Sequence, residues 1–235
     1  MIITIEGNIG AGKSTFLSFL NENVPRINGK RVVVLSEKVD EWLAIVDPST
    51  GRNLFDMFYT DPNQHAYVFQ TYVLLSRVQH LIDFARLHTN DIIVCERGFM
   101  TDCVIFARSM RDKGTLSDLE WDVYQKWHKA VCNVFPMHID GQIYLRATPD
   151  TCIQRIKHRA RPGEENITRD YIEDLHNRHD EWLMSPSVPV PPTIIVDADA
   201  DLVANETIRV NVATQITDFI SQITHGLQES TTTLS

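Results

Sequence analysis

The feature that most constrains the fold is a glycine-rich motif close to the start of the chain. Residues 7–14 read GNIGAGKS and fill every position of the pattern G-x-x-x-x-G-K-[ST]. The apolar run at 1–5 precedes this motif, and a segment typical of a helix follows it, so a chance glycine turn before an ordinary helix is disfavoured. In such a strand–loop–helix unit, inward-facing N–H groups and the helix dipole hold phosphate, the lysine reaches the outer phosphates, and the serine can ligate Mg²⁺. The motif predicts that a nucleoside triphosphate is bound by Gly7, Asn8, Ile9, Gly10, Ala11, Gly12, Lys13, Ser14 and Thr15.

Short β-branched runs alternate with longer periodic segments along the rest of the chain. The runs predict strands at 2–6, 31–35, 92–95, 142–145 and 193–196. The periodic segments predict helices at 14–23, 64–87, 101–111, 117–135, 149–158, 169–184 and 206–223. The strands are nearly all apolar, as parallel strands covered on both faces are. We therefore expect one doubly wound α/β domain over 1–225, with a five-stranded parallel sheet and helices on both faces, and a frayed tail at 226–235.

Composition and charge exclude several classes of function. The 235-residue chain carries a net charge of -9, which argues against a general nucleic-acid or anionic-membrane binder, because either would need a basic face. No apolar stretch approaches the roughly 18 residues of a membrane span. The four cysteines form no C-x-x-C pair and predict neither a zinc site nor a disulfide framework. Reduced thiols, and a first strand that starts at the initiator methionine, lead us to expect a cytoplasmic or nuclear protein without a targeting segment.

Charged residues follow the second and third predicted strands. Ligands of a doubly wound sheet collect beyond the carboxyl ends of its strands, where Glu37, Glu96 and Arg97 are expected. Taken alone, Glu37 reads as a solvated loop acid and the Glu96–Arg97 pair as an exposed ion pair. Beside a phosphate-binding loop they favour phosphoryl transfer, which needs a proton acceptor, a bound cation and positive charge at the transferred group.

The densest basic cluster of this acidic chain lies at 155–161. Arg155 and Arg159 are four residues apart, hence on one face of the predicted helix, and Arg161 follows just before a Pro-Gly break. Cations that suit a helix C-terminus are an equally good interpretation on composition alone. Combined with the phosphate loop, the segment 155–167 is typical of an arginine lid that closes over a triphosphate.

These motifs together resemble the deoxyribonucleoside kinases, and within them the deoxycytidine and deoxyguanosine kinase group. The resemblance rests on residues 5–15, 69–72, 75–77, 95–97, 143–152 and 155–161, which recur in the family's order and span about 2–202. It implies a single P-loop kinase domain that transfers the γ-phosphate of ATP to the 5′-hydroxyl of a deoxynucleoside, with Mg²⁺, in nucleotide salvage. It also implies a homodimer formed through the helices at 64–87 and 117–135. The expected partners are therefore small molecules and a second copy, with no nucleic acid and no membrane.

The resemblance also implies roles for individual residues. Glu37 stands at the position of the general base, and Arg97 is held against the 5′ oxygen and that base. Glu96 and Ser14 are expected at the magnesium ion. The expected contacts of the deoxynucleoside are Trp42, Tyr59, Phe69, Gln70, Val73, Arg77, Asp102, Phe106 and Glu164, with Tyr59 and Glu164 at the sugar 3′-hydroxyl. The lid arginines Arg155, Arg159 and Arg161 and the segment containing Asp201 and Leu202 complete the expected phosphate-donor site.

The pocket residues give mixed indications of the preferred base. Arg77 and Asp102 resemble members that accept deoxycytidine or purines, and breaking such a pair to admit a methyl group would cost several kcal/mol. Val73 resembles the thymidine-accepting members. We expect deoxycytidine and purine deoxynucleosides to be favoured over thymidine, while a thymidine-accepting or broad-specificity kinase stays open.

Two departures from the family pattern and three rival classes bear on this interpretation. Gly98 stands where the family usually has serine, and Pro162-Gly163 stands where relatives have polar lid residues. A nucleoside monophosphate kinase would share the fold but needs no carboxylate beside a sugar hydroxyl. A switch GTPase would need an Asn-Lys-x-Asp motif, which the sequence lacks. A catalytically silent phosphate-loop protein is the third alternative.

Overall fold

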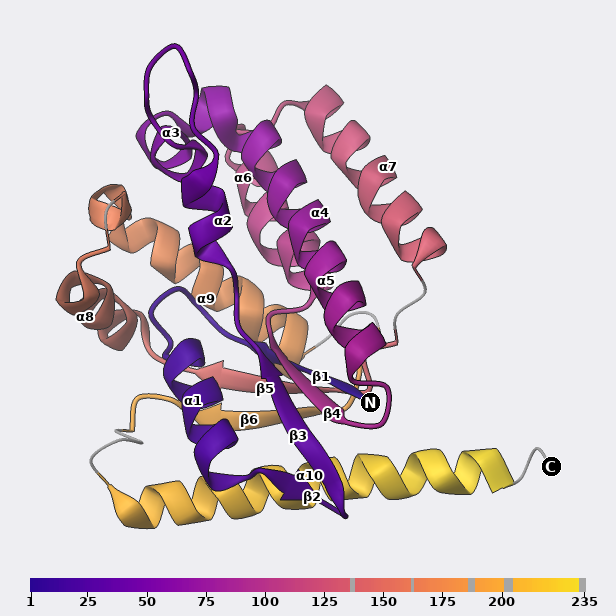
Figure 1. The fold of residues 1–235 in the computed structure, drawn as a ribbon. Helices are drawn as coiled ribbons and strands as arrows, with labels where there is room; N and C mark the ends of the chain where they lie inside the picture. Colours follow the sequence, from indigo (N-terminus) through magenta and orange to yellow (C-terminus); the bar gives the residue numbers. More distant parts are fainter. Residues whose placement is uncertain (136–137, 162, 186–188, 201–204, 233–235) are drawn as a thin grey trace.

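The computed structural model describes residues 1–135, 138–161, 163–185, 189–200 and 205–232 (Figure 1). Its centre is a six-stranded sheet in the order β2-β3-β4-β1-β5-β6. The strands are β1 (Ile2–Glu6), β2 (Arg26–Ile27), β3 (Lys30–Leu35), β4 (Ile92–Glu96), β5 (Gly141–Arg146) and β6 (Thr193–Asp197). All neighbours pair in parallel except β2, which is antiparallel to β3. The predicted α/β fold and the positions of its five parallel strands are confirmed.

The expected number of strands was wrong by one, because the two-residue strand β2 was missed. Ile27 pairs with Lys30 across Asn28 and Gly29, whose φ angles are 49° and 78°. An Asn-Gly pair with both φ angles positive forms the tight turn that suits the twist of a β-hairpin. This dipeptide was therefore the sequence signal for the sixth strand.

Helices fill the connections between the strands. They are α1 (Lys13–Asn23), α2 (Val39–Ala44), α3 (Leu54–Thr60), α4 (Pro62–Leu87), α5 (Phe99–Thr101), α6 (Arg108–Asp112), α7 (Asp118–Val134), α8 (Pro149–Arg159), α9 (Arg169–Met184) and α10 (Glu206–Thr232), with a π-helical segment at Asp102–Ala107 and a 3₁₀ turn at Glu164–Asn166. A helix occupies every predicted range, although the one predicted at 101–111 is π-helical over Asp102–Ala107, and the short helices α2 and α3 were not predicted. At α7, Ser117 accepts from the Glu120 N–H and Glu120 accepts from the Ser117 N–H, so the predicted capping box is confirmed.

The end of the chain differs from the expected frayed tail. Helix α10 continues to Thr232, so the part of 226–235 that the structure describes is helical. Val212, Ile216 and Ile220 on α10 are buried at four-residue spacing in the core cluster that contains β1 and β5. The packing of these apolar residues on the core fixes the first turns of α10. Each further residue then adds a backbone hydrogen bond and costs the conformational entropy of only one residue.

The helices cover both faces of the sheet. One face carries α1, α8 and α10, whose apolar residues share a core with β1 and β5. On the other face Leu81 and Phe84 of α4 pack on Ile93 and Cys95 of β4. Figure 1 shows α10 along one side of the sheet and α4 and α7 on the opposite side. Among the described residues, no helix is both long and apolar enough to cross a bilayer.

The parallel order places three connecting loops at one edge of the sheet. The loops after β1, β3 and β4 all leave from carboxyl ends of adjacent strands. The glycine-rich loop, Glu37 and the Glu96–Arg97 pair are therefore neighbours although they are far apart in the sequence.

Candidate active site

The glycine-rich loop folds tightly between β1 and α1. Gly7, Gly10 and Gly12 have φ angles of 149°, 78° and 94°, which L side chains rarely adopt. A Cβ on Gly10 would lie 2.5 Å from the carbonyl oxygen of Cys152 in α8, so only glycine lets these two backbones approach. The loop is therefore shaped by close packing as well as by its own turn.

Lys13 lies beneath this loop and is buried. Its Nζ donates to the carbonyl oxygens of Asn8 and Gly7 at 2.7 Å and 3.2 Å. Burial, together with the nearby charge of Arg97, lowers the pKa of Lys13 to about 7. An anion bound in the loop would favour the charged ammonium, because a phosphate supplies the partner that burial removes.

Ser14 and Glu96 place hard oxygen ligands next to the loop. The Ser14 hydroxyl donates to Glu96 Oε2 at 3.1 Å, and the Glu96 side chain is largely buried at the end of β4. A hydroxyl and one carboxylate, completed by phosphate oxygens and water, form the ligand set that Mg²⁺ takes in phosphoryl-transfer sites. The residues present therefore fit a magnesium ion.

Arg97 occupies a strained turn directly after β4. Its φ angle is 62°, and its backbone N–H donates to the Ile5 carbonyl at 2.9 Å. The guanidinium donates to Gly7 O at 3.3 Å and stands 5.1 Å above the Phe106 ring. Left-handed backbone at a residue with a long side chain costs about 1–3 kcal/mol, and such strain gathers at functional sites.

Glu6 supports this turn from below, and sequence reasoning missed it. The Glu6 side chain is fully buried and accepts from the Gly98 N–H at 3.0 Å and from the Thr101 hydroxyl at 2.6 Å. A Cβ on Gly98 would lie 3.1 Å from Thr4 Cγ2 and 3.4 Å from Glu6 Oε1. Glycine at this position lets the turn pack closely on β1, which gives a physical reason for this departure from the family pattern.

Glu37 is held between two guanidinium groups. Its Oε1 accepts from Arg77 Nη2 at 2.8 Å, and both of its oxygens lie 3.4–3.5 Å from Arg97 Nη1. Burial alone would raise the pKa of Glu37, but the charges of Arg97, Arg77 and Lys13 outweigh it and lower the pKa to about 2. Glu37 is therefore an ionised carboxylate at neutral pH.

Arg77 also pairs with Asp102, as the sequence led us to expect. Arg77 Nε donates to Asp102 Oδ2 at 2.8 Å, and Nη2 donates to Oδ1 at 3.2 Å. Burial raises the pKa of Asp102, while the guanidinium of Arg77 opposes that rise. Asp102 opens the π-helical segment, and Phe106 lies in the same segment. Such segments recur at functional sites because they redirect side chains within a helix.

A cavity of about 230 Å³ opens among these charged residues. Its apolar end is a cluster of aromatic rings: Phe58 stacks on Phe69 with centroids 4.4 Å apart, and Trp42 meets Phe69 edge-on at 5.8 Å. All nine residues expected to contact the deoxynucleoside line this cavity. Val39, Phe55, Phe58 and Tyr171 also line it and were not foreseen. The aromatic spacing 55, 58 and 59 was the available signal, since it places three rings on one face of α3.

Gln70 presents an unpartnered amide to the cavity. It lies on α4 and is buried, and its Oε1 has no hydrogen-bond partner among the described residues. A buried acceptor without a partner is costly, so a bound molecule that donates to it would recover that cost. The amide offers one acceptor and two donors at the same point.

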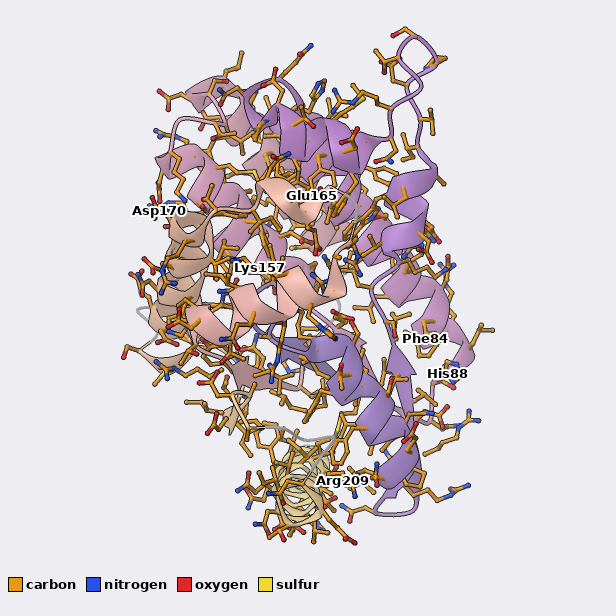
Figure 2. The ribbon with its side chains drawn as sticks, turned by 90° about the vertical axis from the view of Figure 1, so that its left-hand side faces the viewer. Phe84, His88, Lys157, Glu165, Asp170 and Arg209 are labelled. Atoms are coloured by element: carbon orange, nitrogen blue, oxygen red, sulfur yellow. The ribbon has the colours of Figure 1, made fainter. Side chains whose placement is uncertain are left out.

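The predicted lid segment forms one wall of the cavity. Glu164 is buried, and both of its carboxylate oxygens accept from Arg159, with Nη2–Oε1 at 2.8 Å and Nε–Oε2 at 3.1 Å. Gly163 has a φ angle of 91°, and a Cβ there would lie 3.1 Å from the Phe55 ring. In Figure 2, Lys157 on α8 and Glu165 are on the side facing the viewer.

A second cavity, of about 450 Å³, is lined by residues 10–15, at the end of the glycine-rich loop and the start of α1. The residues that line both cavities are Gly10, Lys13, Ser14, Glu96, Arg159 and Arg161. Arg155 lines the second cavity but not the first, and it donates to the Ala11 carbonyl at 3.2 Å. Two compartments thus meet at a lysine, a serine–carboxylate pair and two arginines, which is the arrangement that a phosphoryl transfer between two ligands needs.

Of the described residues that are expected at the phosphate donor, Gly7, Asn8 and Ile9 do not line the second cavity. The Asn8 amide donates to the Ile172 carbonyl in α9 at 2.8 Å, so its side chain anchors the loop to that helix. Ile9 lines the first cavity together with the aromatic rings. Asp201 and Leu202 lie outside the described residues, as does Pro162.

Comparison with known proteins agrees with this geometry. The profile of the family described as deoxynucleoside kinase matches residues 3–221. The chain belongs to the deoxynucleoside kinase family. It is 34% identical to the probable deoxycytidine kinase of fowlpox virus, over 94% of this chain and 88% of that protein. It is 35% identical to human deoxycytidine kinase, over 77% of this chain and 75% of that protein. It is 30% identical to mitochondrial deoxyguanosine kinase of Xenopus laevis, over 86% and 83% respectively.

Proposed function

We propose that this family member transfers the γ-phosphate of ATP to the 5′-hydroxyl of a 2′-deoxynucleoside, as an enzyme of nucleotide salvage. The observation that carries this proposal is the junction of two cavities at Lys13, Ser14 and Glu96, with Glu37 on the aromatic side of that junction. The larger cavity adjoins the glycine-rich loop and suits the triphosphate. The aromatic cavity suits a nucleoside, since stacked rings hold a base while polar groups fix its orientation.

The catalytic roles follow from the charges around Glu37. As an ionised carboxylate, Glu37 can take the proton of the 5′-hydroxyl, and Arg97 beside it can hold the attacking oxygen. Lys13, Arg159 and Arg161 can balance negative charge on the transferred group. A magnesium ion held by Ser14 and Glu96 would neutralise charge on the phosphate oxygens.

The same cavity suggests how the substrate is recognised. Gln70 and the Arg77–Asp102 pair can read the edge of the base between the Trp42, Phe69 and Phe106 side chains. Deoxycytidine and purine deoxynucleosides are the favoured acceptors, because thymidine would meet the buried pair with a methyl group. Tyr59 and Glu164 line the cavity and can bond the sugar 3′-hydroxyl. Glu164 would then divide its hydrogen bonds between that hydroxyl and Arg159.

The organisation of the enzyme completes the proposal. Residues 1–225 form one kinase domain, with 155–167 acting as its lid. Two copies associate through α4 and α7, which expose Val68, Leu75, Leu119, Trp127 and Val134. All four cysteines are free thiols, which supports a reducing compartment such as the cytoplasm.

A coupled ADP-release assay tests the function directly. We expect turnover with ATP and at least deoxycytidine among the four deoxynucleosides, and much slower turnover with ribonucleosides and nucleoside monophosphates. The Glu37→Ala variant should lose 10²-fold or more in kcat, about the size of a general-base contribution, and should still bind ATP. Phosphorylation of monophosphates alone, or full activity of Glu37→Ala, would contradict the proposal.

A further inference from the structure

Arg77 uses almost all of its donors on groups that belong to different parts of the site. A guanidinium has five N–H bonds. Arg77 Nε and one Nη2 N–H go to Asp102, the other Nη2 N–H goes to Glu37, and Nη1 donates to the Glu96 carbonyl at 3.1 Å. A single N–H on Nη1 is thus left for a ligand, counting the partners within the described residues.

The contact from Arg77 is the shortest that Glu37 makes to a cation. Arg77 Nη2 lies 2.8 Å from Glu37 Oε1, whereas Arg97 Nη1 lies 3.4 Å and 3.5 Å from the two carboxylate oxygens. The side chains of Arg77, Glu37 and Asp102 are 9%, 13% and 1% exposed, so water screens this cluster little. The orientation of Glu37 therefore depends mainly on Arg77.

We propose that Arg77 is a positioning residue for Glu37, so that recognition of the nucleobase and placement of the proton acceptor are coupled through one guanidinium. This inference rests on the proposed function, in which Glu37 takes the proton and Arg77 faces the base. A base that accepts only from the remaining Nη1 N–H leaves the Glu37 contact intact. A base that draws on Nη2 competes with Glu37 and shifts the carboxylate beside the 5′-hydroxyl.

The coupling has a consequence for changing the base preference. The pair of substitutions Arg77→Met and Asp102→Ala, which should raise kcat/KM for thymidine relative to deoxycytidine, also removes the main contact of Glu37. Such variants change the phosphoryl-transfer step for every acceptor, in addition to the choice among acceptors.

A double-mutant cycle between Arg77 and Glu37 tests the proposal. The rate of phosphoryl transfer is measured in a single turnover at saturating ATP and deoxycytidine for wild type, Arg77→Met, Glu37→Gln and the double variant. Deoxycytidine affinity is measured separately by calorimetry. We expect Arg77→Met to change the transfer rate at least fivefold when Glu37 is present and less than twofold in the Glu37→Gln background. The change in affinity should be the same in both backgrounds.

Gln70→Leu is the matched control, because Gln70 lines the same cavity and has no contact with Glu37 among those described. Its effect on the transfer rate should be equal in the two backgrounds. The coupling would be overturned if Arg77→Met changed the transfer rate equally with Glu37 and with Glu37→Gln, or changed it in neither. The proposed kinase function would still stand in that case, provided that the wild type is active.

Folding is checked by thermal unfolding, since Arg77→Met leaves the buried Asp102 without its cation and leaves Glu37 with only the longer contact to Arg97. If that variant does not fold, Arg77→Lys and the Arg77→Met/Asp102→Ala pair take its place in the same cycle. Arg77→Lys keeps the positive charge, and Arg77→Met/Asp102→Ala removes the carboxylate of Asp102 together with its partner. For both, the effect on the transfer rate is compared between the Glu37 and Glu37→Gln backgrounds.

Discussion

Single residues in this protein acquire their chemistry from burial and from the charges around them. Glu37 is ionised because cations surround it, whereas Glu6, which is fully buried and accepts from Gly98 and Thr101, has a pKa raised by desolvation. The two residues are both glutamates that end or follow a parallel strand. Their environments, rather than their type, make one a candidate proton acceptor and the other a support for the Arg97 turn.

His179 gives a prediction at this scale. It is fully buried on α9, stacks on Tyr144 with centroids 5.9 Å apart, and its Nδ1 lies 2.6 Å from the Leu175 carbonyl. Burial lowers the pKa of His179 to about 3, so the unfolded chain takes up this proton at higher pH than the folded chain. Its contribution to stability is therefore complete above the ordinary histidine pKa and is lost as the pH falls toward 3, by about 1.4 kcal/mol per unit.

The measurement compares wild type with His179→Phe, which keeps the aromatic stack and cannot be protonated. Urea unfolding at about pH 6.5 and pH 5 should show that the free energy of unfolding falls by about 2 kcal/mol less in the variant. If the free energy of unfolding fell equally in the two proteins between these pH values, His179 would not resist protonation in the folded state.

Secondary-structure elements in this molecule are positioned by close backbone contacts. The glycine-rich loop touches α8 at Gly10, and the lid touches α3 at Gly163. Since α8 carries Arg155 and Arg159, the distance between loop and helix sets where these guanidinium groups lie over the phosphate-donor cavity. The absence of a side chain at Gly10 therefore allows α8 to approach closely enough to place Arg155 and Arg159 over this cavity.

The Gly10→Ala variant tests this dependence. Its Cβ would lie 2.5 Å from the Cys152 carbonyl, so α8 must shift and ATP affinity should fall at least tenfold. Gly114→Ala is the matched control, because Gly114 has a similar φ angle of 73° and no atom within 4 Å of the added carbon. It should cost about 1 kcal/mol of stability and leave ATP affinity unchanged. Calorimetric titration measures ATP affinity, and urea unfolding measures stability, for both variants. Equal losses of ATP affinity in Gly10→Ala and Gly114→Ala would refute the steric argument.

At the level of the whole molecule, the helices α4 and α7, which pack against each other, leave several large apolar side chains exposed. Val68 and Leu75 on α4 and Trp127 and Leu119 on α7 are 41–74% exposed, and both helices lie on the side of the sheet opposite α10 (Figure 1). Exposed apolar side chains that gather on neighbouring helices are typical of an interface between subunits. The proposed homodimer would cover them.

Sedimentation velocity provides the test of this assembly. Trp127→Glu places a charge on that face, and it should convert a dimer at micromolar concentration into a monomer with an unchanged melting profile for the domain. Val210→Glu is the control, since Val210 is 59% exposed on α10 at the opposite side of the sheet. A wild type that sediments as a monomer, or a control that dissociates equally, would argue against this interface.

The positions of the parallel strands, and the chemistry of the loops that follow them, could be predicted from the residue pattern. Periodicity and glycine spacing are local properties, so the phosphate-binding loop, Glu37 and Arg97 could be assigned to one edge of the sheet from residues 7–97 alone. Helix α3 and the hairpin strand β2 escaped because short elements carry little periodicity, although Asn28-Gly29 was a usable signal.

Which of the charged side chains pair depends on how the elements pack, and the sequence pattern does not give it. Arg77 bonds Asp102, Glu37 and the Glu96 carbonyl at sequence separations of 25, 40 and 19 residues, and many other pairings were open to the same side chains. The choice depends on where α4, which carries Arg77, and the π-helical segment, which carries Asp102, pack over the sheet. A linear pattern records which ionisable groups are present, but packing sets their distances and their burial, and the energy between two charges varies inversely with both the distance and the local dielectric constant.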